Sequence, residues 1–185
     1  LAIGLMYPAI LTIIQSLRGR SGDAAFTRSN SQAMFTQPEL LLVLRNTALW
    51  VILVPTLATG IGLIYAILID RARGEAFAKA LIFLPMAISM VGAGIIWKFV
   101  YQYKQTSRPQ IGLLNAILKL FGFETQQFLI NAPLNTFMLI IVMVWIQAGF
   151  AMTVLSAAIK AIPDEIIEAA KHDGVPALKM CRYIT

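Results

Sequence analysis

Four long runs without a charged residue dominate this sequence: residues 1–17, 46–69, 80–97 and 131–159. A helix needs about 20 apolar residues to cross the hydrocarbon core of a bilayer. Because no water is available there to bond the backbone, runs of this length form α-helices. The runs therefore predict an all-α, polytopic membrane protein with about four spans, the first of which is expected to be truncated.

The composition excludes several other classes of protein. Of the 185 residues, 58% are hydrophobic and only 13% are charged, whereas soluble domains carry about 25% charged residues. The net charge of +6 would suit a protein that binds nucleic acid. The basic residues are, however, spread thinly between the apolar runs, as is typical of the segments that flank membrane spans. We expect a single transmembrane domain over residues 1–185 that is incomplete at both ends.

The connections between the runs predict how the chain is oriented. Connections 70–79 and 160–185 must share one side of the membrane, and they have the higher density of Lys and Arg. This favours a cytoplasmic position for both. Connection 98–130 contains a predicted short amphipathic helix over residues 111–121, which Gly122 ends.

Paired glycines within the second and third runs predict close packing between helices: Gly60, Gly62, Gly92 and Gly94. Such glycine pairs also occur in dinucleotide-binding loops, but a loop of that kind follows a β-strand. Small residues inside lipid-length runs are instead typical of helix contacts.

The last connection predicts a helix on the membrane surface. Pro163 is followed by Asp164 and Glu165, which suit a helix N-terminus, and Gly174 suits the position just after a C-terminus. A second helix is expected to begin at 175–176. The apolar side of the first helix is small and rich in alanine, so it suits a protein groove better than lipid.

The spacing within this connection resembles the EAA loop of ABC importer permeases. The sequence reads Glu168-Ala169-Ala170, three residues, Gly174, nine residues, then Ile184. Residues 83–97 and 111–115 are similar to the carbohydrate-uptake branch of the family, which includes the larger membrane subunit of maltose transporters. Residues 134–160 are similar to permeases for alpha-glucosides and glucosylglycerol.

The resemblance implies the membrane domain of a type I ABC importer for an alpha-glucoside or related small sugar, in the bacterial inner membrane. Within 160–185 a coupling helix would dock on a cytoplasmic ATPase dimer through Glu168, Ala169, Ala170, His172, Asp173 and Gly174. Glu168 would pair with a basic ATPase residue, or locally with Lys171 or His172. An exposed amphipathic surface helix without a partner is the alternative to docking.

The resemblance also implies a division of labour between subunits. A second permease would complete the pore, and a periplasmic or lipid-anchored binding protein would deliver the sugar. ATP and Mg would be bound by the ATPase, so this chain is expected to be no enzyme and to hold no cofactor. No metal site is expected either, since His172 and Cys181 are the sole histidine and cysteine of the chain.

In maltose-type permeases, the span before the EAA loop contacts sugar just after a tryptophan. Here that stretch is Trp145-Ile146-Gln147-Ala148-Gly149-Phe150, and Gln147 stands where the family has a glycine. An amide inside lipid is costly unless it is paired, and it both donates and accepts as sugar hydroxyls require. Gln147 and Phe150 are therefore the main substrate candidates, with Ile146 and Gly149 behind them. A bond from Gln147 to a neighbouring helix, with Phe150 as packing, is the alternative.

Two other classes of function compete with the importer. A secondary transporter or channel typically places acidic residues or histidine inside its spans, yet every Asp, Glu and His lies outside the four uncharged runs. An intramembrane enzyme would need paired acids or a Ser/His pair within the runs, and these are absent from them. The EAA spacing separates the importer from both alternatives.

Overall fold

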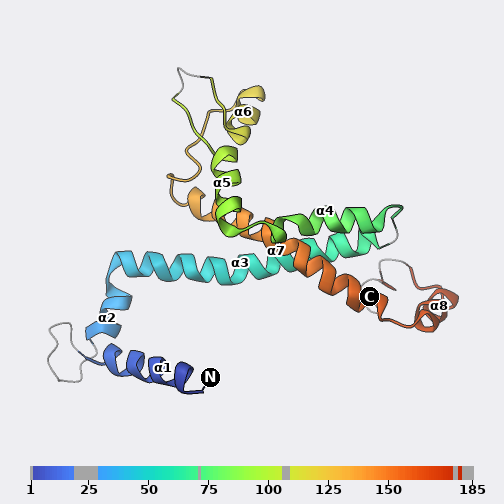
Figure 1. The fold of residues 1–185 in the computed structure, drawn as a ribbon, viewed down its shortest axis with the longest axis horizontal. Helices are drawn as coiled ribbons and strands as arrows, with labels where there is room; N and C mark the ends of the chain where they lie inside the picture. Colours follow the sequence, from blue (N-terminus) through green and yellow to red (C-terminus); the bar gives the residue numbers. More distant parts are fainter. Residues whose placement is uncertain (1, 19–28, 71, 106–108, 177–178, 181–185) are drawn as a thin grey trace. The chain divides into compact units, whose positions relative to one another are not determined.

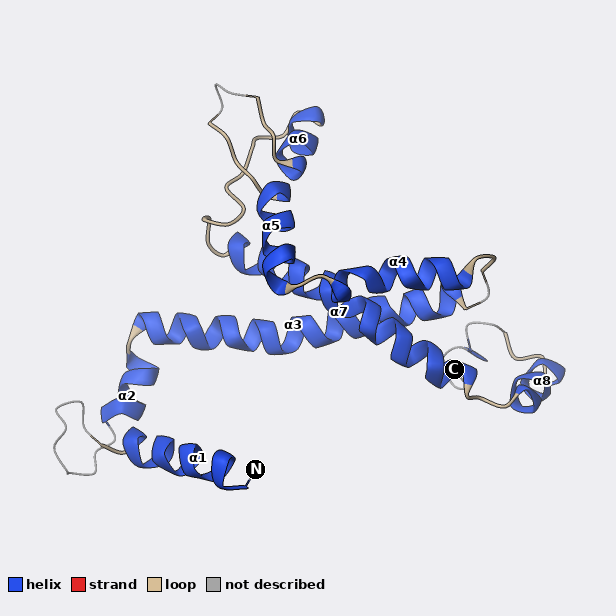
Figure 2. Cartoon of the chain, in the orientation of Figure 1, coloured by secondary structure: helices blue, strands red, loops and turns tan. Residues whose placement is uncertain are grey.

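The structure is a computed structural model that describes residues 2–18, 29–70, 72–105, 109–176 and 179–180. The elements of this described part are all helices, as Figure 2 shows. In chain order they are α1 (Ala2–Ser16), α2 (Ser29–Thr36), α3 (Pro38–Ile69), α4 (Glu75–Ala87), α5 (Met90–Val100), α6 (Leu113–Leu120), α7 (Leu134–Lys160) and α8 (Asp164–His172). The predicted all-α fold is confirmed for these residues.

The chain divides into two compact units, Leu1–Val51 and Ile52–Thr185. The first unit holds α1, α2 and the beginning of α3. Helix α1 has 15 residues, fewer than the roughly 20 that a span requires, so the first predicted span is present only as a short apolar helix. Cys181 and Ile184, together with most of the predicted second helix of the last connection, lie outside the described residues.

Helices α3 and α7 are long and apolar enough to cross a membrane. Helix α7 agrees with the predicted run 131–159. Helix α3 starts earlier than predicted, at Pro38, because the leucine-rich residues before Arg45 continue the helix. Since a long Arg side chain keeps its charge in water while its stem covers apolar surface, Arg45 does not end a helix there. The sequence-based boundary at Asn46 was wrong for this reason.

The third predicted span consists of two helices. Helices α4 and α5 together fill run 80–97, but they bend by 99° at a short break between them. Ile88 is extended there, and the Ser89 hydroxyl accepts a 3.1 Å hydrogen bond from the Gly92 N–H, which starts a new helix. Pro85 weakens the preceding turn because it lacks an N–H and its ring crowds the carbonyl four residues earlier.

The core of the second unit lies where α4 runs beside α7, as Figure 1 shows. Helix α3 meets α7 at Gly62, where an added Cβ would lie 2.6 Å from the Cβ of Ala151 and 2.8 Å from the Met152 backbone nitrogen. The prediction that glycines serve close packing is confirmed for Gly62. Gly60 and Gly94 have no neighbour within 4 Å of such a Cβ among the described residues, so they make no helix contact there.

Helix α6 confirms the predicted amphipathic helix between α5 and α7, and its single asparagine holds the surrounding loop. Asn115 is fully buried, and its amide donates to the carbonyls of Gln102 (3.0 Å) and Gln126 (3.1 Å). Its Oδ1 accepts from the Gln126 N–H at 2.8 Å. Gly112 permits this closure, because a Cβ there would meet the Gln102 backbone.

Replacing Asn115 with alanine is expected to loosen segment 102–131. The change leaves buried backbone groups of Gln102 and Gln126 without partners, at a cost of about 1–3 kcal/mol for each unsatisfied group. Limited proteolysis of the membrane-embedded protein measures the effect, and we expect faster cleavage within this segment. The matched variant Asn131→Ala alters an exposed side chain, so equal cleavage of both variants would contradict the role of Asn115.

Candidate functional site

Helix α8 lies on the predicted EAA segment and follows α7 after a link of three residues. Pro163 occupies the N-cap position, and Asp164 and Glu165 form the first turn. Acidic side chains in the first turn interact favourably with the positive end of the helix dipole, and the basic side chains Lys171 and His172 in the last turn suit its negative end. The sequence therefore specifies both ends of this short helix, and the predicted position is confirmed.

Gly174 ends α8 in a left-handed conformation, with φ of +70°. The Gly174 N–H donates to the Lys171 carbonyl at 3.0 Å, and the Val175 N–H donates to the Ala170 carbonyl at 3.1 Å. This pair of bonds is a Schellman motif, in which glycine avoids the steric cost that a Cβ would carry. The glycine of the EAA spacing thus fixes where the helix stops.

Most of the predicted coupling residues point into solvent. Glu168, Ala169, His172, Asp173 and Gly174 are exposed, and Ala170 is buried. Within the described chain Glu168 forms no ion pair with Lys171 or His172. The exposed side of α8 therefore offers a compact surface with small residues and an unpaired carboxylate.

The two main substrate candidates lie on a part of α7 that the described chain leaves uncovered. Phe150 is 49% exposed and Gln147 is partly exposed. Residues three or four apart share one face of a helix, and this face continues through Leu139 and Val154, which are 46% and 52% exposed. No hydrogen bond joins the Gln147 side chain to another described residue. The amide is therefore available to a ligand or to another helix.

The two lesser candidates lie on the packed side of α7. Ile146 and Gly149 are both buried. A Cβ on Gly149 would meet the Ile82 carbonyl and lie 2.9 Å from the Phe83 Cα, so this glycine sits where α7 crosses α4. Gly149 therefore has a packing contact with α4, which was not predicted from the sequence.

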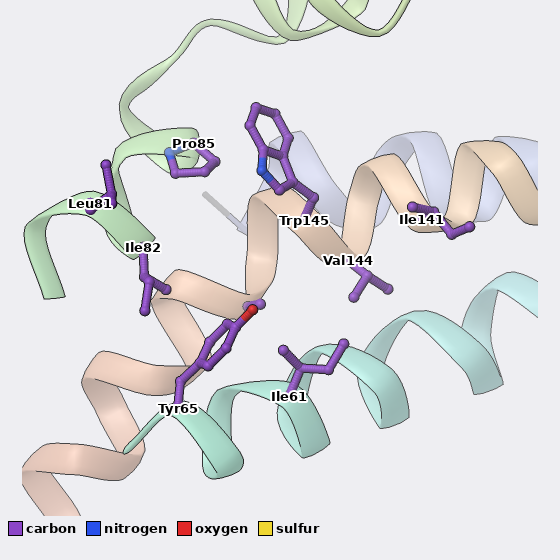
Figure 3. Close-up of a pocket in the computed structure, with 9 residues that line it drawn as sticks. Ile61, Tyr65, Leu81, Ile82, Pro85, Ile141, Val144 and Trp145 are labelled. Carbon is purple, nitrogen blue, oxygen red and sulfur yellow. The ribbon is translucent and has the colours of Figure 1, made fainter. Parts of the chain in front are cut away.

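A cavity of about 340 Å³ opens between α3, α4 and α7. Figure 3 shows its lining, with Tyr65 rising from α3 and Trp145 standing beside Pro85. The remaining walls are aliphatic: Ile61, Leu81, Ile82, Ile141, Val144 and Ala148. Trp145 belongs to this cavity and not to the face of Gln147 and Phe150, because two residues of separation place side chains on nearly opposite sides of a helix.

An aromatic cluster joins the end of α5 to α7. Trp97 meets Trp145 edge-on at a centroid distance of 5.5 Å and Tyr101 at 5.0 Å, and Tyr101 meets Phe128 at 5.8 Å. Burial raises the pKa of Tyr101 to about 12. Its phenol therefore remains protonated at neutral pH and donates to the Met138 carbonyl at 3.1 Å.

A polar cluster at the other end of these helices was not foreseen from the sequence. We define it as Asp70, Glu75, Lys79, Ser156 and Lys160. Lys79 donates to Asp70, to Ser156 and, at 2.8 Å, to Glu75. Ser156 donates to Asp70 at 2.6 Å, and Lys160 pairs with Glu75. These bonds place segment 70–79 beside the end of α7, which confirms that 70–79 and 160–185 share one side.

The described residues hold no group of three or more His, Cys, Asp or Glu side chains placed to bind a metal ion. Four buried side-chain atoms lack a hydrogen-bond partner in the same part of the chain: Asn46 Oδ1, Asp70 Oδ2, Trp97 Nε1 and Gln102 Oε1. Asn46 lies in α3 and Asp70 just after it, and Trp97 lies in α5 with Gln102 shortly after it.

Solved structures match this arrangement of helices. A crystal structure of a bacterial ABC transporter involved in the import of the acidic polysaccharide alginate matches with a TM-score of 0.75 and 20% identity, over 99% of this chain and 62% of that chain. The alginate transporter in complex with a periplasmic protein bound to alginate pentasaccharide matches with a TM-score of 0.67 and 22% identity, over 98% of this chain and 66% of that chain. The fold is that of an ABC importer permease.

The sequence comparisons define the family. The profile described as "Binding-protein-dependent transport system inner membrane component" matches residues 42–185, and the chain belongs to this family. It is 44% identical to the osmoprotective compounds uptake permease protein GgtC of Synechocystis, over 98% of this chain and 65% of that protein. It is 46% identical to the alpha-glucoside transport system permease protein AglF of Rhizobium meliloti, over 94% of this chain and 52% of that protein. The chain thus spans between about half and two thirds of these relatives.

Proposed function

We propose that this protein is a permease subunit of an ATP-driven ABC importer for an alpha-glucoside or a related small sugar, in the inner membrane. The observation that carries the proposal is α8, a helix with defined ends that directly follows a candidate span and exposes Glu168 and Ala169 of the EAA motif. The family membership and the names of GgtC and AglF support the substrate class.

In this proposal the chain performs no chemistry itself. Helix α8 docks on an ATPase dimer that holds ATP and Mg, and closure of that dimer moves the spans. A second permease completes the pore, and a periplasmic or lipid-anchored binding protein delivers the sugar. The second alginate structure, which includes a periplasmic protein with bound oligosaccharide, supports the last of these partners.

Purification from the membrane of its own cells in mild detergent tests the assembly. We expect a P-loop ATPase and a second EAA-bearing permease at stoichiometric levels by mass spectrometry. ATP-dependent uptake of radiolabelled sucrose, trehalose or glucosylglycerol by proteoliposomes then tests the substrate class. A well-folded homo-oligomer without these partners would reject the proposal and favour a secondary transporter or channel.

The substrate role of α7 gives a narrower prediction. Gln147→Leu replaces a partly exposed amide with an apolar side chain of similar size. The half-saturating sugar concentration for uptake is therefore expected to rise by about three- to tenfold, the worth of one hydrogen bond. The matched variant Gln102→Leu changes an amide outside this face and should leave that concentration unaltered. If Gln147→Leu behaves like the control while folding normally, the amide serves helix packing.

A further inference from the structure

The polar cluster ties three helices together one turn away from α8. Asp70 follows the end of α3, Glu75 and Lys79 lie in the first turns of α4, and Ser156 and Lys160 lie at the end of α7. Lys160 is four positions before Asp164, where α8 begins. We propose that this cluster is the joint through which movement of α8 reaches the α3–α4 hairpin. This inference rests on the proposed function of α8.

The link between α7 and α8 is held by hydrogen bonds. The Ala161 N–H donates to the carbonyls of Ala157 (3.1 Å) and Ala158 (3.2 Å), and the Ile162 N–H donates to the Ile159 carbonyl at 3.2 Å. The Ile166 N–H then donates to the Pro163 carbonyl at 3.1 Å. Each residue of the link is thus bonded either to the last turn of α7 or to the first turn of α8. A displacement of α8 is therefore passed to the last turn of α7.

Polar bonds carry that displacement onward to the hairpin. The close glycine contacts of α7 lie farther from α8, at Gly149 against α4 and at Met152 against Gly62 of α3. Toward the end of α7, Ala157 and Ala158 are exposed, and Lys160 is exposed over half of its side chain. In this part of the described chain, the bonds of Lys79 and Lys160 connect α7 to segment 70–79.

The negative and positive charges of the cluster are equal in number. Two carboxylates, Asp70 and Glu75, face two ammonium groups, Lys79 and Lys160, and the Ser156 hydroxyl bridges one pair. The carboxyl side chain of Asp70 is only 9% exposed. Loss of Lys79 leaves the Asp70 carboxylate mostly buried and without a cationic partner, which favours separation of α7 from the hairpin.

Lys79→Met in the complete transporter tests the joint, since methionine keeps the length of the side chain and removes its charge. We expect the number of sugar molecules taken up per ATP hydrolysed to fall about tenfold, within the range typical of coupling between two sites, while co-purification with the ATPase is retained. The matched variant Lys98→Met lies at the exposed end of α5 and should keep the original ratio. An assembled Lys79→Met transporter with an unchanged ratio would overturn the proposal.

A milder pair of variants decides the question if Lys79→Met does not assemble. Ser156→Ala removes one hydroxyl and keeps all four charges, whereas Thr153→Ala removes a hydroxyl that bonds only within α7, to the Phe150 carbonyl at 2.8 Å. The proposal expects a lower ratio of uptake to hydrolysis for Ser156→Ala alone, and equal ratios overturn it. Failure of the proposed function itself is distinct, because the unaltered protein would then show no ATP-dependent uptake.

Discussion

Replacing Gly149 with alanine is expected to separate α4 from α7. The added Cβ would meet the Ile82 carbonyl and lie 2.9 Å from the Phe83 Cα. Both are backbone atoms, which cannot rotate away as a side chain can. Overpacking of this kind costs about 1–3 kcal/mol, so the thermal unfolding midpoint in detergent should fall by about 2–12 °C. Gly149→Leu should prevent recovery of folded protein altogether.

Gly94→Ala is the matched control for this prediction. Gly94 lies within α5 and has no neighbour within 4 Å of an added Cβ in the described chain. Since glycine inside a helix is less stable than alanine by about 0.5–1 kcal/mol, this variant should match or exceed the original midpoint. Equal midpoints for the alanine variants at 149 and 94 would refute the contact. Sugar uptake by a stable Gly149→Ala variant would separately test its candidacy as a substrate contact.

Enlarging the exposed face of α8 is expected to abolish coupling. Ala169→Phe adds a bulky ring beside Glu168, on the surface that we propose docks on the ATPase. Because docking surfaces are packed as closely as protein interiors, the ring should weaken docking by about 1–3 kcal/mol, or about fivefold to 150-fold. Sugar uptake and recovery of the ATPase during purification should fall together.

The control for α8 is the same substitution on an exposed alanine elsewhere. Ala116 lies in α6 and is exposed, and Ala116→Phe should leave recovery of the ATPase unaltered. Full recovery of the ATPase together with unaltered sugar uptake for Ala169→Phe would argue that α8 is a surface helix without this partner. Reduced uptake with full recovery would instead place Ala169 in the transmission of movement.

Local patterns were enough to predict α6, α7 and α8. Gly122 and Gly174 have positive φ and end their helices where expected, because a glycine in the left-handed region stops a helix at little steric cost. The uncharged run over α7 is long enough that only a helix satisfies its backbone in lipid. The residues that determine where these helices begin and end are close together in the sequence, so the positions of the helices can be predicted from it.

Contacts between distant residues explain what the sequence did not reveal. Asp70 bonds to Lys79 and to Ser156, and Ser156 lies 86 positions farther along the chain. Gly149 was read as a substrate contact because the helix it would touch could not be placed from the sequence. The break after Ala87 combines Pro85 with a capping Ser89, and each residue alone is tolerated within a span.

The ion pair between Glu75 and Lys160 settles the parity of membrane crossings for the bent helices. Helices α3 and α7 are both long and apolar enough to cross a membrane, and they end beside each other, where Lys160 at the end of α7 pairs with Glu75 of segment 70–79. The chain between them must therefore return to the opposite side before α7 begins. Among the described helices between α3 and α7, α4 and α5 together are long and apolar enough for that return, so we count this pair as a single crossing despite its 99° bend.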